Sequence, residues 1–308
     1  MKHLLYLKEL NQGTISRLLT QAESLLMTDN FVSEKYQTLR GYTVANLFYE
    51  PSTRTRGSFQ IAAKKLGADI LNFDEKMSSS EKGETILDTI YTLESMGINY
   101  FVIRHSEAGM HAMVAKHVKE NSHVINAGEA DISHPTQGLL DLLTIKQHKK
   151  NFDQLKVVII GDIKHSRVAR SLAEGLKIMS VKELTLISPE SLKPNLEDYV
   201  DANYTSNLDE GLIDADVVMA LRIQQERITN SSEEFVSENY FNNYGLTNQR
   251  LASCNDDVII MHPGPMNRGI EISDNVADGK HSVIREQVTN GISVRMALLS
   301  MMQAEVMK

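Results

Sequence analysis

The chain has 308 residues, of which 42% are hydrophobic, as expected for one large or two medium globular domains. Its net charge of −8, with 32 basic and 40 acidic residues and no basic run, argues against a general role in nucleic-acid binding. We expect a cytoplasmic globular protein, because the N-terminus lacks the features of a signal peptide, no segment approaches the ~20 apolar residues of a membrane span, and the single cysteine, Cys254, offers neither a disulfide framework nor a cysteine-based metal site.

Hydrophobic periodicity predicts helices that alternate with apolar strands along the chain. In chain order, the predicted elements are a helix over 15–26, a strand over 43–49, a helix over 58–67 that ends at Gly67, a helix over 83–97, strands over 100–105 and 122–128, a helix over 134–150 that is entered through Pro135, strands over 156–162, 183–188, 216–222 and 257–265, and a last helix over 293–308.

This alternation predicts an α/β protein of two domains, each a mainly parallel sheet flanked by helices. A polar stretch at 148–156 separates two blocks of the alternation. We therefore expect a first domain over residues 1–147 and a second over 148–287. The C-terminal helix, about 288–308, is expected to pack back on the first domain.

Five polar clusters lie at or just after the carboxyl ends of predicted strands, where ligands bind in open α/β sheets. The first is STRTR at residues 52–56, between a strand and a helix. Free N–H groups at a helix start, hydroxyl groups and guanidinium forks would together favour a phosphate. The alternative is that Ser52 only caps the helix and that both arginines are solvated. The stretch by itself leaves both readings open.

The other four clusters carry arginine, histidine and glutamine side chains. They are Arg104 with His105 at the end of the strand 100–105, HPTQ at 134–137, GDIKHSRVARS at 161–171 with Arg167 and Arg170, and LRIQQER at 221–227 paired with HPGP at 262–265. Taken singly, such residues are often surface charges or structural histidines. Taken together, they predict a cleft rich in arginine and poor in carboxylates, which suits anionic substrates and catalysis by positioning and electrostatics.

Several other functional classes lack their sequence motifs. GDIKHS stands where a dinucleotide-binding fold would show G-x-G-x-x-G, and the chain contains neither a P-loop motif nor G-x-S-x-G. The histidines at 105, 111, 117, 123 and 134 do not have zinc-site spacing. We expect neither a cofactor nor a metal.

The order of the motifs points to one family. STRTR, KGET, RHSE, HPTQ, G-D-x-K-x-S-R-V-A-R, L-R-x-Q-x-E-R and H-P-x-P resemble the catalytic chains of aspartate carbamoyltransferases over nearly the whole sequence. The resemblance implies a first domain that binds carbamoyl phosphate, a second that binds L-aspartate, and a site in the cleft between them. The implied reaction gives N-carbamoyl-L-aspartate and phosphate, a step of pyrimidine biosynthesis.

The same resemblance implies roles for individual residues. The expected catalytic residues are Arg54, Thr55, Arg104 and His134. Carbamoyl phosphate is expected to contact Ser52, Thr53, Arg54, Thr55, Arg104, His134, Gln137, Gly264 and Pro265. Aspartate is expected to contact Lys82, Arg167, Arg222 and Gln224.

The resemblance also implies a homotrimer with shared active sites. The loop over residues 76–85 is expected to carry Lys82 and a serine, either Ser79 or Ser80, into the site of a neighbouring chain. The expected partners are therefore small-molecule substrates and copies of the chain itself. No nucleic acid, membrane or regulatory chain is assigned.

Two alternatives remain. Ornithine carbamoyltransferases share the fold and the first motif, but they carry H-C-L-P where this chain has HPGP, and a cationic acceptor site would repel ornithine. A non-catalytic anion-binding protein would not need Thr55, Arg104 and His134 together.

Two positions depart from the family pattern. Gly57 replaces a bulky apolar residue, so that we expect a looser helix start, and Ser133 stands where the family has glutamine, so that we expect a different loop before His134.

Overall fold

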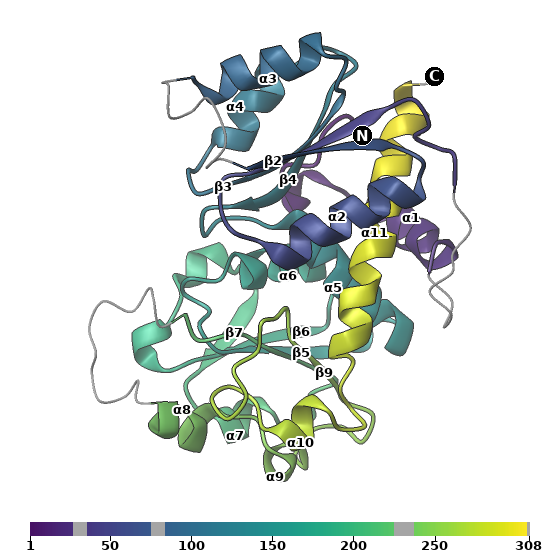
Figure 1. Ribbon diagram of the computed structural model, residues 1–308. Coiled ribbons are helices and arrows are strands. Elements are labelled where there is room, and N and C mark those ends of the chain that lie inside the picture. Colours follow the sequence, from purple (N-terminus) through teal and green to yellow (C-terminus); the bar gives the residue numbers. More distant parts are fainter. Residues whose placement is uncertain (27–35, 75–83, 225–236, 307–308) are drawn as a thin grey trace. The chain divides into compact units, whose positions relative to one another are not determined.

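The structure, a computed structural model, describes residues 1–26, 36–74, 84–224 and 237–306 (Figure 1). The chain divides into two compact units. Unit 1 comprises Met1–Leu143 and Thr289–Lys308, and unit 2 comprises Thr144–Val288. The predicted boundary at residues 147 and 148, and the roles predicted for the two domains, stay predictions.

Unit 1 contains a four-stranded parallel sheet with the strand order β2-β1-β3-β4 (Figure 1). Its elements are η1 (Leu7–Glu9), α1 (Gln12–Ser24), β1 (Thr43–Phe48), α2 (Thr53–Lys65), β2 (Asp69–Asp74), α3 (Ile86–Ser95), β3 (Tyr100–His105), α4 (Met110–His117), β4 (His123–Glu129), α5 (Pro135–His148) and α11 (Ile284–Val306), of which the last two run across the boundary between the units.

The core of unit 1 forms around β1, β3 and β4, whose residues are almost all buried, including most of their apolar side chains. Leu47, Phe101 and Val124 from these strands pack with Ile90 of α3 and Val114 of α4. Burial of each such side chain contributes roughly 1.5–3 kcal/mol. This core fixes the three strands whose carboxyl ends carry the candidate site.

The C-terminal helix α11 belongs to unit 1 from Thr289 onward. Its Gln303 accepts a hydrogen bond of 2.6 Å from the Tyr100 hydroxyl, and its Ser293 hydroxyl donates to the Leu25 carbonyl at 3.3 Å. Arg295, also on α11, is buried over the ring of Phe59 on α2, with 4.9 Å from the guanidinium carbon to the ring centroid. The helix begins at Ile284, four residues before the expected start at about 288 and nine before the helical run that the sequence showed from 293.

Unit 2 contains a five-stranded parallel sheet with the order β7-β6-β5-β8-β9 (Figure 1). Its elements are η4 (Phe152–Gln154), β5 (Lys156–Ile160), α6 (Arg167–Ile178), β6 (Glu183–Ile187), η5 (Glu190–Leu192), η6 (Leu196–Asp198), β7 (Ala202–Thr205), α7 (Leu208–Gly211), β8 (Val217–Ala220), α8 (Ser237–Tyr244), α9 (Asn248–Leu251), β9 (Ile259–Met261) and α10 (Asp274–Ala277). Side chains from β5, β8, β9 and the short helices α7, α9 and α10 form one apolar cluster.

The predicted fold class is confirmed, since both units are parallel sheets flanked by helices. The main differences are two strands, β2 and β7, and the helix α4, none of which was predicted. Within the described ranges, no helix is long and apolar enough to cross a membrane.

Candidate functional site

The candidate site residues of unit 1 follow three strands that are neighbours in the sheet. STRTR follows β1, Arg104 lies near the end of β3, and His134 and Gln137 follow β4. Because the strands are parallel, their carboxyl ends lie at one edge of the sheet. The sequence-based expectation that these motifs occupy strand ends is therefore met in unit 1.

The phosphate-binding candidate stands at a helix start. Ser52 is the N-cap residue of α2, with extended backbone angles and no side-chain capping bond. Thr53 and Arg54, in the first turn, are exposed, whereas Thr55 is buried. A helix start of this kind presents N–H groups and the positive end of the helix dipole to an anion.

Thr55 and His134 are brought together by the fold, although 79 positions separate them in the sequence. The Thr55 hydroxyl oxygen lies 3.4 Å from His134 Nε2, and both side chains are buried. His134 precedes Pro135, the first residue of α5, so that its side chain is held at a helix start as well. A hydroxyl and an imidazole can each donate a hydrogen bond, so that two such neighbouring groups can serve one oxygen atom of a ligand.

Arg104 is half-buried and has a carboxylate partner. Its Nε lies 3.1 Å from Glu50 Oε2, and its Nη1 donates to the Ala127 carbonyl at 3.5 Å. The expectation of a site poor in carboxylates is wrong at this position. Glu50 is part of the sequence FYEPSTRTR, but the sequence did not indicate that it would contact an arginine of β3.

Gln137 also has a carboxylate neighbour. Its side-chain amide donates to Asp141 Oδ1 at 2.9 Å, one helical turn along α5. Asp141 is fully buried. Burial lowers the pKa of Arg295 on α11 to about 9, and the negative charge of Asp141 opposes this shift only in part. Gln137 is thus oriented by a fully buried carboxylate.

The candidate site residues of unit 2 also follow neighbouring strands. Arg167 is the first residue of α6 after β5, Arg222 and Gln224 follow β8, and Gly264 and Pro265 follow β9. Ser166 caps α6 by accepting from the Ala169 N–H, which fixes the place where the helix begins. The Gly264–Pro265 peptide bond is cis.

Asp162 was not named from the sequence, yet it organises this edge of unit 2. Its fully buried carboxylate lies 2.8 Å from His165 Nδ1 through Oδ1 and accepts from the Gln224 backbone N–H at 3.4 Å through Oδ2. The Gln224 side chain in turn donates to the His165 carbonyl at 3.1 Å. The sequence did offer one indication of a functional role for Asp162, because this residue directly follows the apolar run KVVIIG.

Gly57 and Ser133, which depart from the family pattern, lie within α2 and in the turn before His134, respectively. A Cβ atom added at Gly57 would meet no atom within 4 Å, and α2 begins four residues earlier, at Thr53. Ser133 closes a turn in which its carbonyl accepts from the Glu129 N–H at 2.9 Å and its N–H donates to the Glu129 carbonyl at 3.2 Å. The predicted positions of Ser79, Ser80 and Lys82 lie outside the described residues.

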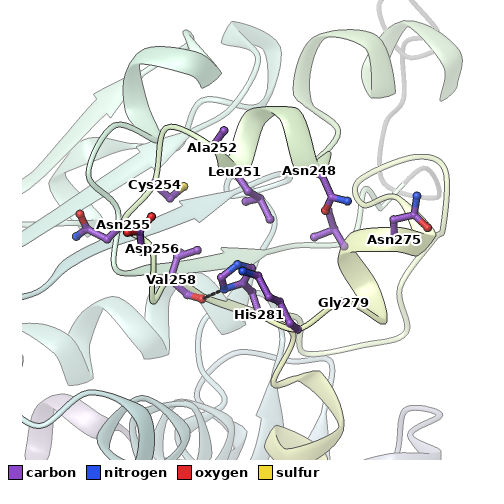
Figure 2. A pocket seen from close by; sticks show the side chains of 12 residues that line it. Asn248, Leu251, Ala252, Cys254, Asn255, Asp256, Val258, Asn275, Gly279 and His281 are labelled. Atoms are coloured by element: carbon purple, nitrogen blue, oxygen red, sulfur yellow. Dashed lines mark hydrogen bonds between the residues drawn. The ribbon is translucent and has the colours of Figure 1, made fainter.

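A cavity of about 330 Å³ lies elsewhere in unit 2 (Figure 2). Its lining includes Asn248, Cys254 and Asn275, together with His281, whose Nδ1 lies 3.0 Å from the Val258 carbonyl. Burial raises the pKa of the Cys254 thiol to about 11. No predicted substrate-binding residue lines this cavity, so its size carries less weight than the chemistry of the strand ends.

Two domain matches decide the family. Residues 2–147 match the carbamoyl-P binding domain of aspartate/ornithine carbamoyltransferases, and residues 153–302 match their Asp/Orn binding domain. The chain belongs to the aspartate/ornithine carbamoyltransferase family. The first match contains the candidate residues of unit 1, and the second contains those that follow β5, β8 and β9.

Solved structures of carbamoyltransferases have the same fold. Aspartate transcarbamoylase from Trypanosoma cruzi in complex with N-(phosphonacetyl)-L-aspartic acid is 29% identical, with a TM-score of 0.87 over 97% of this chain and 95% of that one. The same enzyme with carbamoyl phosphate and aspartate is 28% identical, with a TM-score of 0.85 over 97% and 96%. Ornithine carbamoyltransferase from Thermus thermophilus, 24% identical with a TM-score of 0.84 over 98% and 99%, shares the fold.

Proposed function

We propose that this carbamoyltransferase uses L-aspartate as its acceptor. The reaction would be attack of the aspartate α-amino group on the carbonyl carbon of carbamoyl phosphate, which forms the C–N bond of N-carbamoyl-L-aspartate and releases phosphate. The observation that carries the proposal is the pair of arginines, Arg167 and Arg222, at neighbouring strand ends of the Asp/Orn binding domain.

The sign of these charges selects the acceptor. Guanidinium forks bind carboxylates bidentately, and aspartate offers two of them. Ornithine carries a side-chain ammonium group, which two arginines would repel. The HPGP sequence, with Pro263 where ornithine carbamoyltransferases have cysteine, supports the same choice. The solved aspartate transcarbamoylase structures at 28–29% identity support it as well.

The carbamoyl-P binding domain would hold the other substrate. We assign the phosphate to Ser52, Thr53 and Arg54 at the start of α2, where N–H groups and the helix dipole favour an anion. Gln137 is assigned to carbamoyl phosphate as well. Gly264 and Pro265, which follow β9 in unit 2, are assigned to the same substrate.

Catalysis would come from donors placed around the carbamoyl oxygen. That oxygen gains negative charge as the amine attacks, and Thr55, His134 and Arg104 are the donors assigned to it. The 3.4 Å between Thr55 Oγ1 and His134 Nε2 leaves both groups able to approach one oxygen atom. Donors fixed in advance stabilise the transition state without reorganisation. Lys82, which lies outside the described residues, is assigned to the carboxylates of an aspartate bound in the site of a neighbouring chain.

The test compares acceptors. Purified protein is incubated with carbamoyl phosphate and aspartate, with carbamoyl phosphate and ornithine, or with carbamoyl phosphate alone, and both phosphate and the carbamoylated amino acid are measured. We expect turnover with aspartate only. Turnover with ornithine only would refute the proposed acceptor. Binding of carbamoyl phosphate without turnover of either acceptor would favour the non-catalytic anion-binding alternative.

A further inference from the structure

A buried carboxylate lies beneath the catalytic edge of unit 1. Glu129, the last residue of β4, has no exposed surface, and neither it nor its partners belong to the substrate-binding residues assigned above. Its Oε1 accepts from the Gly109 N–H at 2.6 Å and from the Tyr6 hydroxyl at 3.2 Å. Its Oε2 accepts from the Asn126 side-chain amide at 3.2 Å and lies 3.7 Å from His111 Nδ1.

These contacts reach the segment that follows Arg104. Gly109 ends the turn after β3 and is the N-cap residue of α4, so that its bond to Glu129 ties this turn to β4. His111, in the first turn of α4, lies with its Nε2 2.8 Å from the Ile103 carbonyl. The peptide unit of that carbonyl includes the nitrogen of Arg104. Its orientation therefore sets the direction in which Arg104 leaves the strand.

The backbone of Glu129 holds the segment that precedes His134. The Glu129 carbonyl accepts from the N–H groups of Ile132 and Ser133 at 2.9 and 3.2 Å, and Ala130 donates its N–H to the His105 carbonyl at 3.0 Å. Ala130 has a φ of 44°, a conformation that a non-glycine residue keeps only when its surroundings enforce it. Glu129 thus joins the segment that follows Arg104 to the segment that precedes His134.

From this geometry, and resting on the proposed function, we propose that Glu129 is a positioning residue that holds Arg104 and His134 in their catalytic arrangement. Burial alone would raise the pKa of the Glu129 carboxyl, but His111 and the donors from Gly109 and Tyr6 outweigh it, so that the pKa lies below its usual value. The carboxylate form, which accepts at both oxygens, is therefore the one present at neutral pH.

The arrangement predicts that glutamine cannot replace Glu129. Both oxygens face donors, so that an amide must turn its NH₂ group toward one of them whichever way it is oriented. Asn126 cannot turn over to help, because its amide also donates to the Leu5 carbonyl at 2.9 Å and its oxygen accepts from the Gly128 N–H at 2.8 Å. The turn after β3 and the segment before His134 must then shift to relieve the contact between the new amide group and the donor that it faces.

The experiment compares Glu129→Gln with Glu94→Gln. Glu94 is a matched control in the same unit, a buried carboxylate that accepts from the Lys119 N–H and the Ser122 hydroxyl at the other end of β4. We expect Glu129→Gln to lower kcat about ten- to a hundredfold, since misplacement of about 1 Å has effects of that size. The KM for the acceptor should change less than about twofold, because Arg167, Arg222 and Gln224, which are assigned to it, lie in unit 2. Glu94→Gln should keep the wild-type kcat.

Hydrogen exchange supplies a readout that does not depend on activity. Exchange at the Ala130 and Ser133 amides, which do not bond the carboxylate itself, should become faster in Glu129→Gln and stay unchanged in Glu94→Gln. If Glu129→Gln does not fold, Tyr6→Phe removes one donor from the same carboxylate and should lower kcat by up to about fivefold. Wild-type kcat and wild-type exchange in these variants would overturn the positioning role. If the wild-type protein carbamoylates neither acceptor, the proposed function fails, and the exchange rates alone decide the role of Glu129.

Discussion

Replacement of His134 tests whether the Thr55–His134 contact serves the reaction. In His134→Ala, the buried donor 3.4 Å from Thr55 is lost, while the helix start at Ser52 that would bind the phosphate is untouched. Loss of one such donor typically lowers kcat by about 10²–10³, or roughly 2.7–4 kcal/mol of transition-state stabilisation. Affinity for carbamoyl phosphate should fall by less than about tenfold, because the donor acts mainly on charge that develops during the reaction.

A second substitution separates the donor from the shape of the side chain. Glutamine carries an amide nitrogen that can reach the position of His134 Nε2, so His134→Gln should recover about tenfold of the lost kcat. The measurements are initial rates at saturating substrates and equilibrium dialysis of carbamoyl phosphate. His117→Ala, an exposed histidine on α4, is the control and should behave as wild type. A near-normal kcat in His134→Ala would remove this residue from the mechanism.

Three further predictions concern the acceptor, the assembly and the stability of the fold. Arg222→Lys should raise the KM for aspartate about tenfold and leave carbamoyl phosphate affinity unchanged in a binding titration, because lysine cannot form the bidentate pair; the reverse pattern would mean that the domain roles are exchanged. Mixing the inactive variants Lys82→Ala and Arg54→Ala, under conditions that exchange subunits, should restore activity in mixed trimers, and no recovery would show that the loop serves its own chain. The pKa of His3, lowered from 6.5 to about 4 by burial, predicts that the unfolding free energy falls between pH 6.5 and 4, since the unfolded chain binds a proton that folded His3 does not. Urea denaturation at pH 5 should show a loss from His3 of at most about 2 kcal/mol, so that the total loss is smaller in His3→Gln, where His123, whose pKa is also lowered by burial, still contributes.

The strands that were predicted are those that the fold buries on both faces. β1, β3 and β5 read as continuous apolar runs, because helices cover both sides of a parallel sheet. β2 and β7 are edge strands, and polar residues such as Asp69 and Asn72 interrupt their apolar pattern. β4 and β9 are edge strands as well, yet both were predicted, and all of their residues are buried. Hydrophobic runs therefore predict buried strands well and partly exposed edge strands poorly.

For the candidate site, the sequence predicted where residues lie along the strands but not which residues they contact. Motif residues such as Thr55 and His134 could be placed at strand ends, because strand ends are visible in the sequence. Their partners could not, because a contact such as that of Arg104 with Glu50, or of Gln224 with Asp162, depends on which strands become neighbours. The order of the strands in the sheet is determined by packing, and it cannot be predicted from the hydrophobic pattern of each strand.

These partners change how the electrostatics of the site should be understood. Carboxylates repel anions, yet Glu50 contacts Arg104, and Glu129 and Asp162 are buried next to candidate site residues of unit 1 and unit 2, respectively. Each buried carboxylate faces several donors, so that much of its charge is compensated locally and its cost to a nearby anion is reduced. What it contributes is fixed geometry. Donors that are held before the substrate binds need not reorganise during the reaction, and this is the condition under which hydrogen bonds lower a barrier most. In each unit, a buried carboxylate thus holds the segments that carry the candidate binding residues.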